Sequence, residues 1–136
     1  MALIHQATAQ NAATDGVVDR IEDGASAGTF RIFTAAFGTQ LVQINLDDPS
    51  FDSASSGLST LANVAKLSGT ATSSGLAAAW ALMDSFDNHI IEGTITESGG
   101  GGDLEFQGSS SAYVNSGQTV SLNIGAITYR AMAVGS

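Results

Sequence analysis

The chain has 136 residues with a formal net charge of −9 at pH 7, a length typical of one domain around one core. This charge would repel a phosphate backbone or an anionic membrane, and no segment approaches the roughly 20 apolar residues that span a bilayer, so we expect neither nucleic-acid nor membrane binding. Without cysteine the chain has no disulfide bond, thiolate chemistry or cysteine–zinc site, and the start MALIHQATAQ lacks the pattern of a secretory signal peptide.

The first predicted element is a short amphipathic helix over residues 13–24. Apolar and acidic residues there recur at helical spacing, the apolar ones at Ala13, Val17, Val18 and Ile21 and the acidic ones at Asp15, Asp19 and Glu22. We expect the acidic side to face solvent and Gly24 to end the helix. Residues 1–12 are expected to be an N-terminal arm, either a tail or a segment that orders on a partner.

From residue 28 to residue 133 the apolar period becomes two, which predicts strands without intervening helices. The predicted strands are Thr29–Phe33, Gln40–Leu46, Val64–Thr72, Leu76–Leu82, His89–Thr96, Asp103–Gln107, Gln118–Ile124 and Ile127–Met132. Such spacing is typical of antiparallel sheets. We therefore predict one mainly β domain over residues 1–136, an antiparallel β-sandwich of Ig-like or jelly-roll-like type with one short N-terminal α-helix.

The stretch SGLAAAWALMDS is ambiguous, because alanine, leucine and methionine also favour a helix. We prefer a strand, since Leu76, Ala78, Trp80 and Leu82 fall on one alternating face and a turn-rich DSFDNH follows. The other aromatic residues are expected mostly to fill the core. Trp80, within the alanine-rich strand, is expected to be buried rather than to form an exposed sugar-binding platform.

Four consecutive glycines, Gly99 to Gly102, follow the predicted strand that ends at Thr96. A phosphate-binding loop needs a helix directly after it, whereas acidic, strand-like DLEFQG follows here. Too few residues remain for a second domain. We predict a loop between two strands, mobile or fixed by a neighbour, because ordering each glycine is entropically costly.

His89 is the residue most open to a catalytic interpretation. It follows Asp87 and Asn88, and a dyad or triad with a serine is conceivable, while the other histidine, His5, lies in the expected arm. We prefer a turn residue that leads into a strand, and we predict that the protein is not an enzyme and has no cofactor.

Calcium is the better metal candidate. Asp47, Asp48 and Asp52 cluster in one predicted loop, and Asp84 and Asp87 lie in another. Neither stretch has EF-hand spacing, and aspartate is an ordinary turn residue. We therefore predict no metal and keep the three residues of the first loop as weak calcium candidates.

Several motifs, in chain order, resemble a family of small virion proteins of tailed bacteriophages. They are LDDPSFDSASSG, ALMDSFDNHIIEGTIT, ESGGGGDLEF and SGQTVSLNIGAITYRA, and the resemblance runs from about Ala13 to Ala133. The chain departs from the family pattern at LAAAWAL, where relatives carry a more polar strand.

The resemblance implies a virion structural protein, foremost a capsid decoration (cement) protein on the outer surface of the head, after synthesis in the host cytoplasm. Its expected partners are the major capsid protein and neighbouring copies of itself. With only 12% charged residues, the surface suits such packing, because few charges need to be desolvated. The alternatives are a tail or neck component and a carbohydrate-binding host-attachment module.

Three regions are the expected partner contacts. They are the arm with Leu3, Ile4 and His5, the loop with Pro49 and Phe51, and the glycine loop with Gly99, Gly100, Gly101 and Gly102.

Overall fold

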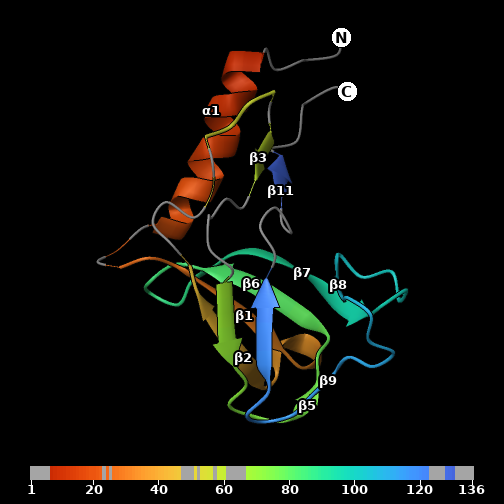
Figure 1. Cartoon of the computed structure of the whole chain (residues 1–136). Helices are drawn as coiled ribbons and strands as arrows, with labels where there is room; N and C mark the ends of the chain where they lie inside the picture. Colours follow the sequence, from red (N-terminus) through yellow and green to blue (C-terminus); the bar gives the residue numbers. More distant parts are fainter. Residues whose placement is uncertain are drawn as a thin grey trace.

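The computed structural model describes residues 7–22, 24, 26–46, 51, 53–56, 58–60, 67–122 and 128–130. The helical elements are α1 (Ala7–Val18), η1 (Asp19–Glu22) and η2 (Ala35–Phe37). The strands are β1 (Thr29–Phe33), β2 (Gln40–Asn45), β3 (Leu58–Thr60), β4 (Leu67–Thr70), β5 (Gly75–Leu76), β6 (Ala79–Met83), β7 (His89–Glu97), β8 (Leu104–Phe106), β9 (Tyr113–Val114), β10 (Thr119–Leu122) and β11 (Thr128–Arg130). The protein is mainly β with one N-terminal α-helix (Figure 1), and every predicted strand contains or overlaps an observed one.

The main sheet has the strand order β2-β1-β6-β7-β8. The pairings β2–β1, β1–β6 and β6–β7 are antiparallel, as predicted. Three further antiparallel pairs are β4–β10, β3–β11 and β5–β9. The β4–β10 pair continues from the β2 edge of the main sheet, because the Thr72 amide that follows β4 donates to the Leu41 carbonyl of β2 at 2.9 Å.

The β7–β8 pairing is parallel, which corrects the expectation of a wholly antiparallel sheet. Parallel neighbours usually need a crossover of about a dozen residues or more. Here only residues 98–103 connect the two strands, and they contain the glycine run. Gly99 and Gly101 have φ values of 83° and 84°, which other residues adopt only with strain. The glycines therefore allow a compact return of the chain.

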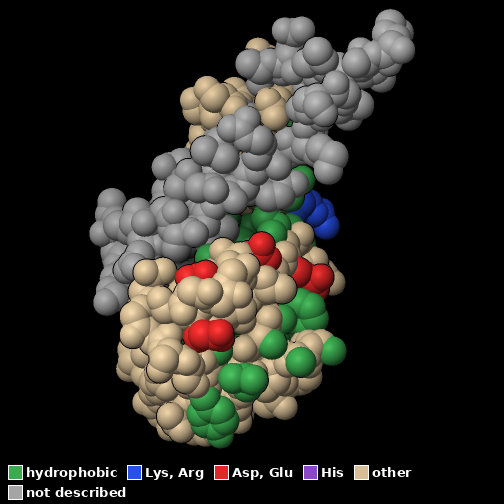
Figure 2. Space-filling model, turned by 90° about the vertical axis from the view of Figure 1, so that its right-hand side faces the viewer, with side chains coloured by type: hydrophobic (Ala, Val, Ile, Leu, Met, Phe, Trp, Pro, Cys, Tyr) green, Lys and Arg blue, Asp and Glu red, His purple; other side chains and the backbone are tan. Residues whose placement is uncertain are grey.

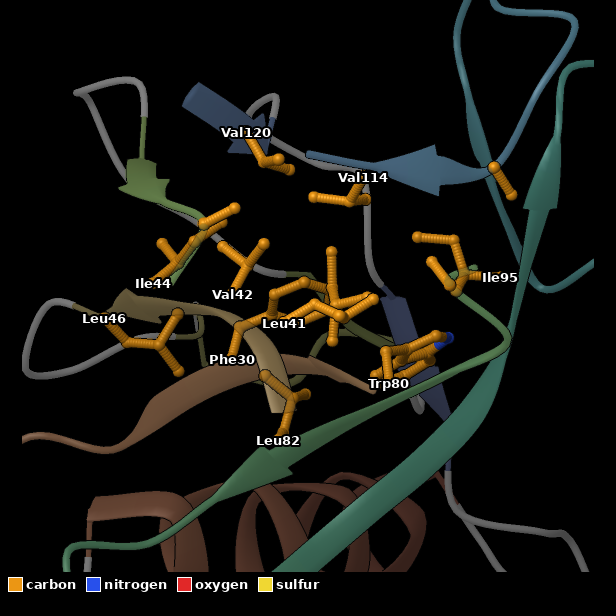
Figure 3. Close-up of a cluster of buried hydrophobic side chains, with 14 of the residues drawn as sticks. Phe30, Leu41, Val42, Ile44, Leu46, Trp80, Leu82, Ile95, Val114 and Val120 are labelled. Atoms are coloured by element: carbon orange, nitrogen blue, oxygen red, sulfur yellow. The ribbon is translucent and has the colours of Figure 1, made fainter. Parts of the chain in front are cut away.

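The core lies between the main sheet and the pairs β4–β10 and β5–β9. Phe30 and Ile32 of β1, with Val42 and Ile44 of β2, are almost fully buried. Figure 3 shows Val114 and Val120, from β9 and β10, across the core from these strands. The alternating apolar residues of β1 and β2 face this interior, as their sequence pattern predicts.

Trp80 is buried in β6, as predicted, with 5% of its surface exposed. Its ring stacks on Phe30 with centroids 5.7 Å apart, and its indole N–H donates to the Thr94 carbonyl at 3.1 Å. Gly93 pairs with Trp80 across the sheet, and a Cβ there would lie 2.5 Å from the indole ring. The glycine of EGT is therefore required by the tryptophan opposite.

The preference for strand over helix in residues 76–82 is confirmed for β6, but Leu76 is not on its buried face. The chain forms two strands here, and Leu76 lies in β5, where it is 60% exposed. The break between β5 and β6 interrupts the alternation on which the prediction depended.

Helix α1 begins at Ala7 rather than at residue 13, so part of the expected arm is helical, and it ends at Val18, where the 3-10 helix η1 follows, rather than at Gly24. Its first turns are rich in alanine, which has the highest helix propensity. Val18, with Ile21 of η1, enters the core. Asp15 does not simply face solvent, because its carboxylate accepts a hydrogen bond from the Ala54 amide at 2.6 Å.

Candidate contact surface

The expected partner contacts divide into residues outside and inside the described part of the chain. Those outside it are Leu3, Ile4, His5 and Pro49, together with the calcium candidates Asp47, Asp48 and Asp52. Phe51 is described, and only 6% of its surface is exposed. Its side chain belongs to the core cluster, so it is a packing residue rather than an exposed contact.

The glycine loop is at the surface, and a carboxylate holds it in place. The Glu105 oxygens accept hydrogen bonds from the Gly99 amide at 2.9 Å and from the Gly101 amide at 3.0 Å. These two bonds lower the pKa of Glu105, against a weaker opposing effect of desolvation. A residue of the following strand thus holds the loop through two hydrogen bonds within the chain.

Two threonines of β7 hold the other half of the glycine loop. The Asp103 carboxylate accepts from the Thr94 amide at 2.8 Å and from its hydroxyl at 3.1 Å, and the Thr94 hydroxyl accepts from the Asp103 amide. The Thr96 hydroxyl accepts from the Gly102 amide at 3.1 Å. The loop amides are therefore largely occupied by the chain itself, which leaves little of the loop for an external anion.

The β6–β7 turn, residues 84–88, is organised around a buried carboxylate. Asp84 is 1% exposed and accepts hydrogen bonds from the Phe86 amide at 2.9 Å, the Asn88 amide at 2.9 Å and the Asn88 side-chain amide at 3.1 Å. Burial alone would raise the pKa of Asp84, but these bonds and the positive charge of Arg20 together hold it below its ordinary value.

Asp87 fixes the far side of the same turn. Its backbone has a φ of 65°, a left-handed conformation in which a glycine would be less strained. Its carboxylate pairs with the Arg31 guanidinium of β1 at 2.6 Å, and Arg31 also donates to Thr29 and Gln40. An aspartate with this partner therefore ties the turn to the neighbouring strand.

Phe86 lies in this turn and is 68% exposed, more than the other exposed large hydrophobic residues of the described chain, Leu76 at 60% and Tyr113 at 51%. Leu76 and Tyr113 face each other across the β5–β9 pair, in a different part of the fold (Figure 1). The sequence analysis did not select Phe86. The available signal was a phenylalanine in the middle of an otherwise polar turn, DSFDNH.

His89 is the first residue of β7, as the preferred interpretation predicts. Its Nδ1 lies 2.6 Å from a Glu92 carboxylate oxygen. Its ring lies 5.8 Å from that of Phe33 and 5.1 Å from that of Phe37, measured between centroids. The imidazole therefore lies at the sheet surface, next to two phenylalanine rings and one carboxylate.

Two further properties bear on the kind of site that the chain offers. Among the described residues, no group of three or more histidine, aspartate or glutamate side chains is placed to hold a metal ion. In the same part of the chain, no helix is long and apolar enough to cross a membrane.

Figure 2 shows one face on which most of the described surface is uncharged, with hydrophobic side chains gathered below a group of acidic ones. This agrees with the low charged fraction of the sequence. Comparisons with protein-family models, curated proteins and solved structures find no match.

Proposed function

We propose that this chain is a structural protein of the virion of a tailed bacteriophage, and specifically a capsid decoration protein that binds the outside of the head. The observation that carries the proposal is a large, exposed aromatic side chain, Phe86, held on an ordered turn of an acidic, charge-poor body. An exposed apolar group of this kind is suited to protein–protein contact. The resemblance of the sequence motifs to the phage family gives the proposal its partner.

On this proposal the chain binds the major capsid protein and neighbouring copies of itself, and it has no reacting group of its own. A partner that binds only the assembled lattice stabilises that lattice by mass action. Many copies on one shell multiply weak contacts. The charge of −9 keeps the protein apart from the packaged nucleic acid.

The β-sandwich assignment is part of the same proposal. It is supported by the position of the core between the main sheet and the β4–β10 and β5–β9 pairs. The parallel β7–β8 pair is a departure from a simple Ig-like or jelly-roll arrangement.

The carbohydrate-binding alternative would need an exposed aromatic platform, which Trp80 does not supply, because it is buried and hydrogen-bonded within the sheet. A tail or neck component remains the competing virion role, and it differs from decoration in copy number.

Quantitative mass spectrometry of purified particles separates these roles. We expect a copy number comparable to that of the major capsid protein, and selective loss of this chain from intact heads in mild denaturant. A copy number far below that of the capsid protein would assign the chain to the tail or neck, and absence from particles would end the proposal.

A further inference from the structure

Phe86 combines strong exposure with a turn that several contacts hold in place. Leaving an aromatic ring 68% exposed forgoes the free energy of burying it. Most exposed hydrophobic residues need no explanation. At this position, however, the surrounding turn is held by several contacts, so the backbone that carries the ring has a defined position.

The first restraint is the buried Asp84 carboxylate, which accepts the amide of Phe86 itself at 2.9 Å. The second is the Arg31–Asp87 ion pair, which fixes the residue that follows. Together they hold the backbone on both sides of the ring.

The third restraint is the close approach of the turn to Gly24. A Cβ at Gly24 would lie 1.8 Å from the Ser85 hydroxyl oxygen and 3.0 Å from a carbon of the Phe86 ring. The glycine therefore allows the turn to rest against the backbone that follows η1.

A contact residue on a backbone that is already ordered loses less conformational entropy on binding than one on a mobile loop, which is the physical basis of preorganised contact residues. Large aromatic residues that enter a desolvated pocket dominate the binding energy of many interfaces. A phenylalanine on an ordered turn has both properties.

The charges around the ring limit the kind of partner. The exposed Asp87 side chain beside the ring is paired with Arg31, so the charge that selects a partner is the net −9 of the whole chain. A second copy would bring the same acidic surface, and like charges oppose such a contact. The complementary surface is therefore an apolar pocket with basic residues around it.

We propose that Phe86 is the anchor by which this protein docks on its partner, and that it enters an apolar pocket with a basic rim on the major capsid protein. The identity of the partner rests on the proposed function. The choice of Phe86 as the anchor and the chemistry of the pocket are inferred from the β6–β7 turn and the charge of the chain.

The experiment measures binding of the purified full chain to empty heads assembled from the major capsid protein of the same virus. The test variant is Phe86→Ser. The matched control is Tyr113→Ser, which removes another exposed aromatic ring from a different part of the fold. Thermal unfolding of each variant is measured in parallel.

We expect Phe86→Ser to weaken binding by at least about tenfold, in the range of an anchor residue, with an unchanged unfolding temperature. Tyr113→Ser should bind as the wild type does. Binding of the wild type should weaken as the salt concentration rises, because a basic rim is attracted to the net negative charge of the chain.

Each of the other outcomes would overturn one part of the proposal. Wild-type binding by Phe86→Ser overturns the anchor while the decoration role stands. Salt-independent binding overturns the basic rim. Failure of the wild type to bind the heads at all overturns the decoration role and, with it, the docking site.

Discussion

The two connections that flank β7 are each held by a carboxylate that accepts backbone N–H groups, and they differ in where that carboxylate lies. In the β6–β7 turn it is Asp84, which is 1% exposed. In the glycine loop it is Glu105, which lies at the surface and comes from the following strand.

The two connections also differ in the residues that adopt positive φ values. The glycine loop places glycines, Gly99 and Gly101, at its positive φ values, whereas the β6–β7 turn places Asp87 there and holds it by an ion pair. Side-chain contacts therefore hold the turn in a conformation that its backbone does not favour. In the loop, glycines adopt the positive φ values without strain, and the carboxylate that holds them lies at the surface. This contrast predicts which substitutions matter at each connection.

The largest effect is expected from Asp84→Ala in the turn. The amides of Phe86 and Asn88 would lose their acceptor, and we expect the free energy of unfolding to fall by about 2–3 kcal/mol. Urea denaturation followed by circular dichroism measures it. Asp84→Asn keeps one acceptor oxygen and should cost less, and an Asp84→Ala protein as stable as the wild type would refute the role of the carboxylate.

The next effect is expected from Gly101→Ala in the loop. A Cβ at Gly101 meets nothing within 4 Å, so only its φ of 84° opposes the change. We expect a loss of about 1 kcal/mol in the free energy of unfolding. Gly101→Asn is the control, because asparagine tolerates left-handed backbone better and should lose less. Equal stability of all three proteins would contradict the left-handed conformation.

The sequence predicted the elements of the sheet well, because the signal of alternation is local. In β1 and β2 the apolar residues that alternate in the sequence face the core, and Leu41, outside the alternation, joins them there. The same holds for Trp80, whose burial follows from its alanine-rich surroundings.

What escaped prediction depends on contacts between distant segments. The parallel pairing of β8 depends on how the chain returns after the glycine loop, and the burial of Phe51 depends on its place in a shared core. The exposure of Phe86 follows from the geometry of the turn, which composition does not reveal. The residues of the turn could be recognised from the sequence, but not the exposure of the phenylalanine among them.

A smaller effect is expected from Glu105→Gln. Because Glu105 lies at the surface and its charge is screened by water, the loss of stability should be less than that of Asp84→Ala. Hydrogen exchange should nevertheless become faster at the amides of Gly99 and Gly101, while those of Phe86 and Asn88 keep their protection. A loss of unfolding free energy as large as that of Asp84→Ala would remove the distinction between the buried and the surface carboxylate.

The smallest and most graded effect is the response to acid. The pKa values of Asp84 and Glu105 are both lowered in the folded protein, so between the ordinary carboxyl value of roughly 4 and the folded value the unfolded chain binds more protons. Their contribution to stability is therefore complete above the ordinary value and is lost as the pH falls through the folded one.

Asp84→Asn and Glu105→Gln each remove one titrating group, so each variant should lose less stability than the wild type between neutral pH and the acid limb. Urea denaturation at a series of pH values measures these slopes, with Gln43→Ala, at an exposed position of β2, as a control that should keep the wild-type slope. If both variants kept the wild-type slope, the acid sensitivity would belong to other carboxylates. The carboxyl groups of Asp84 and Glu105 would then stabilise the fold through their geometry alone. Hydrogen bonds that are equally strong to the charged and the protonated carboxyl make no contribution to the pH dependence of stability.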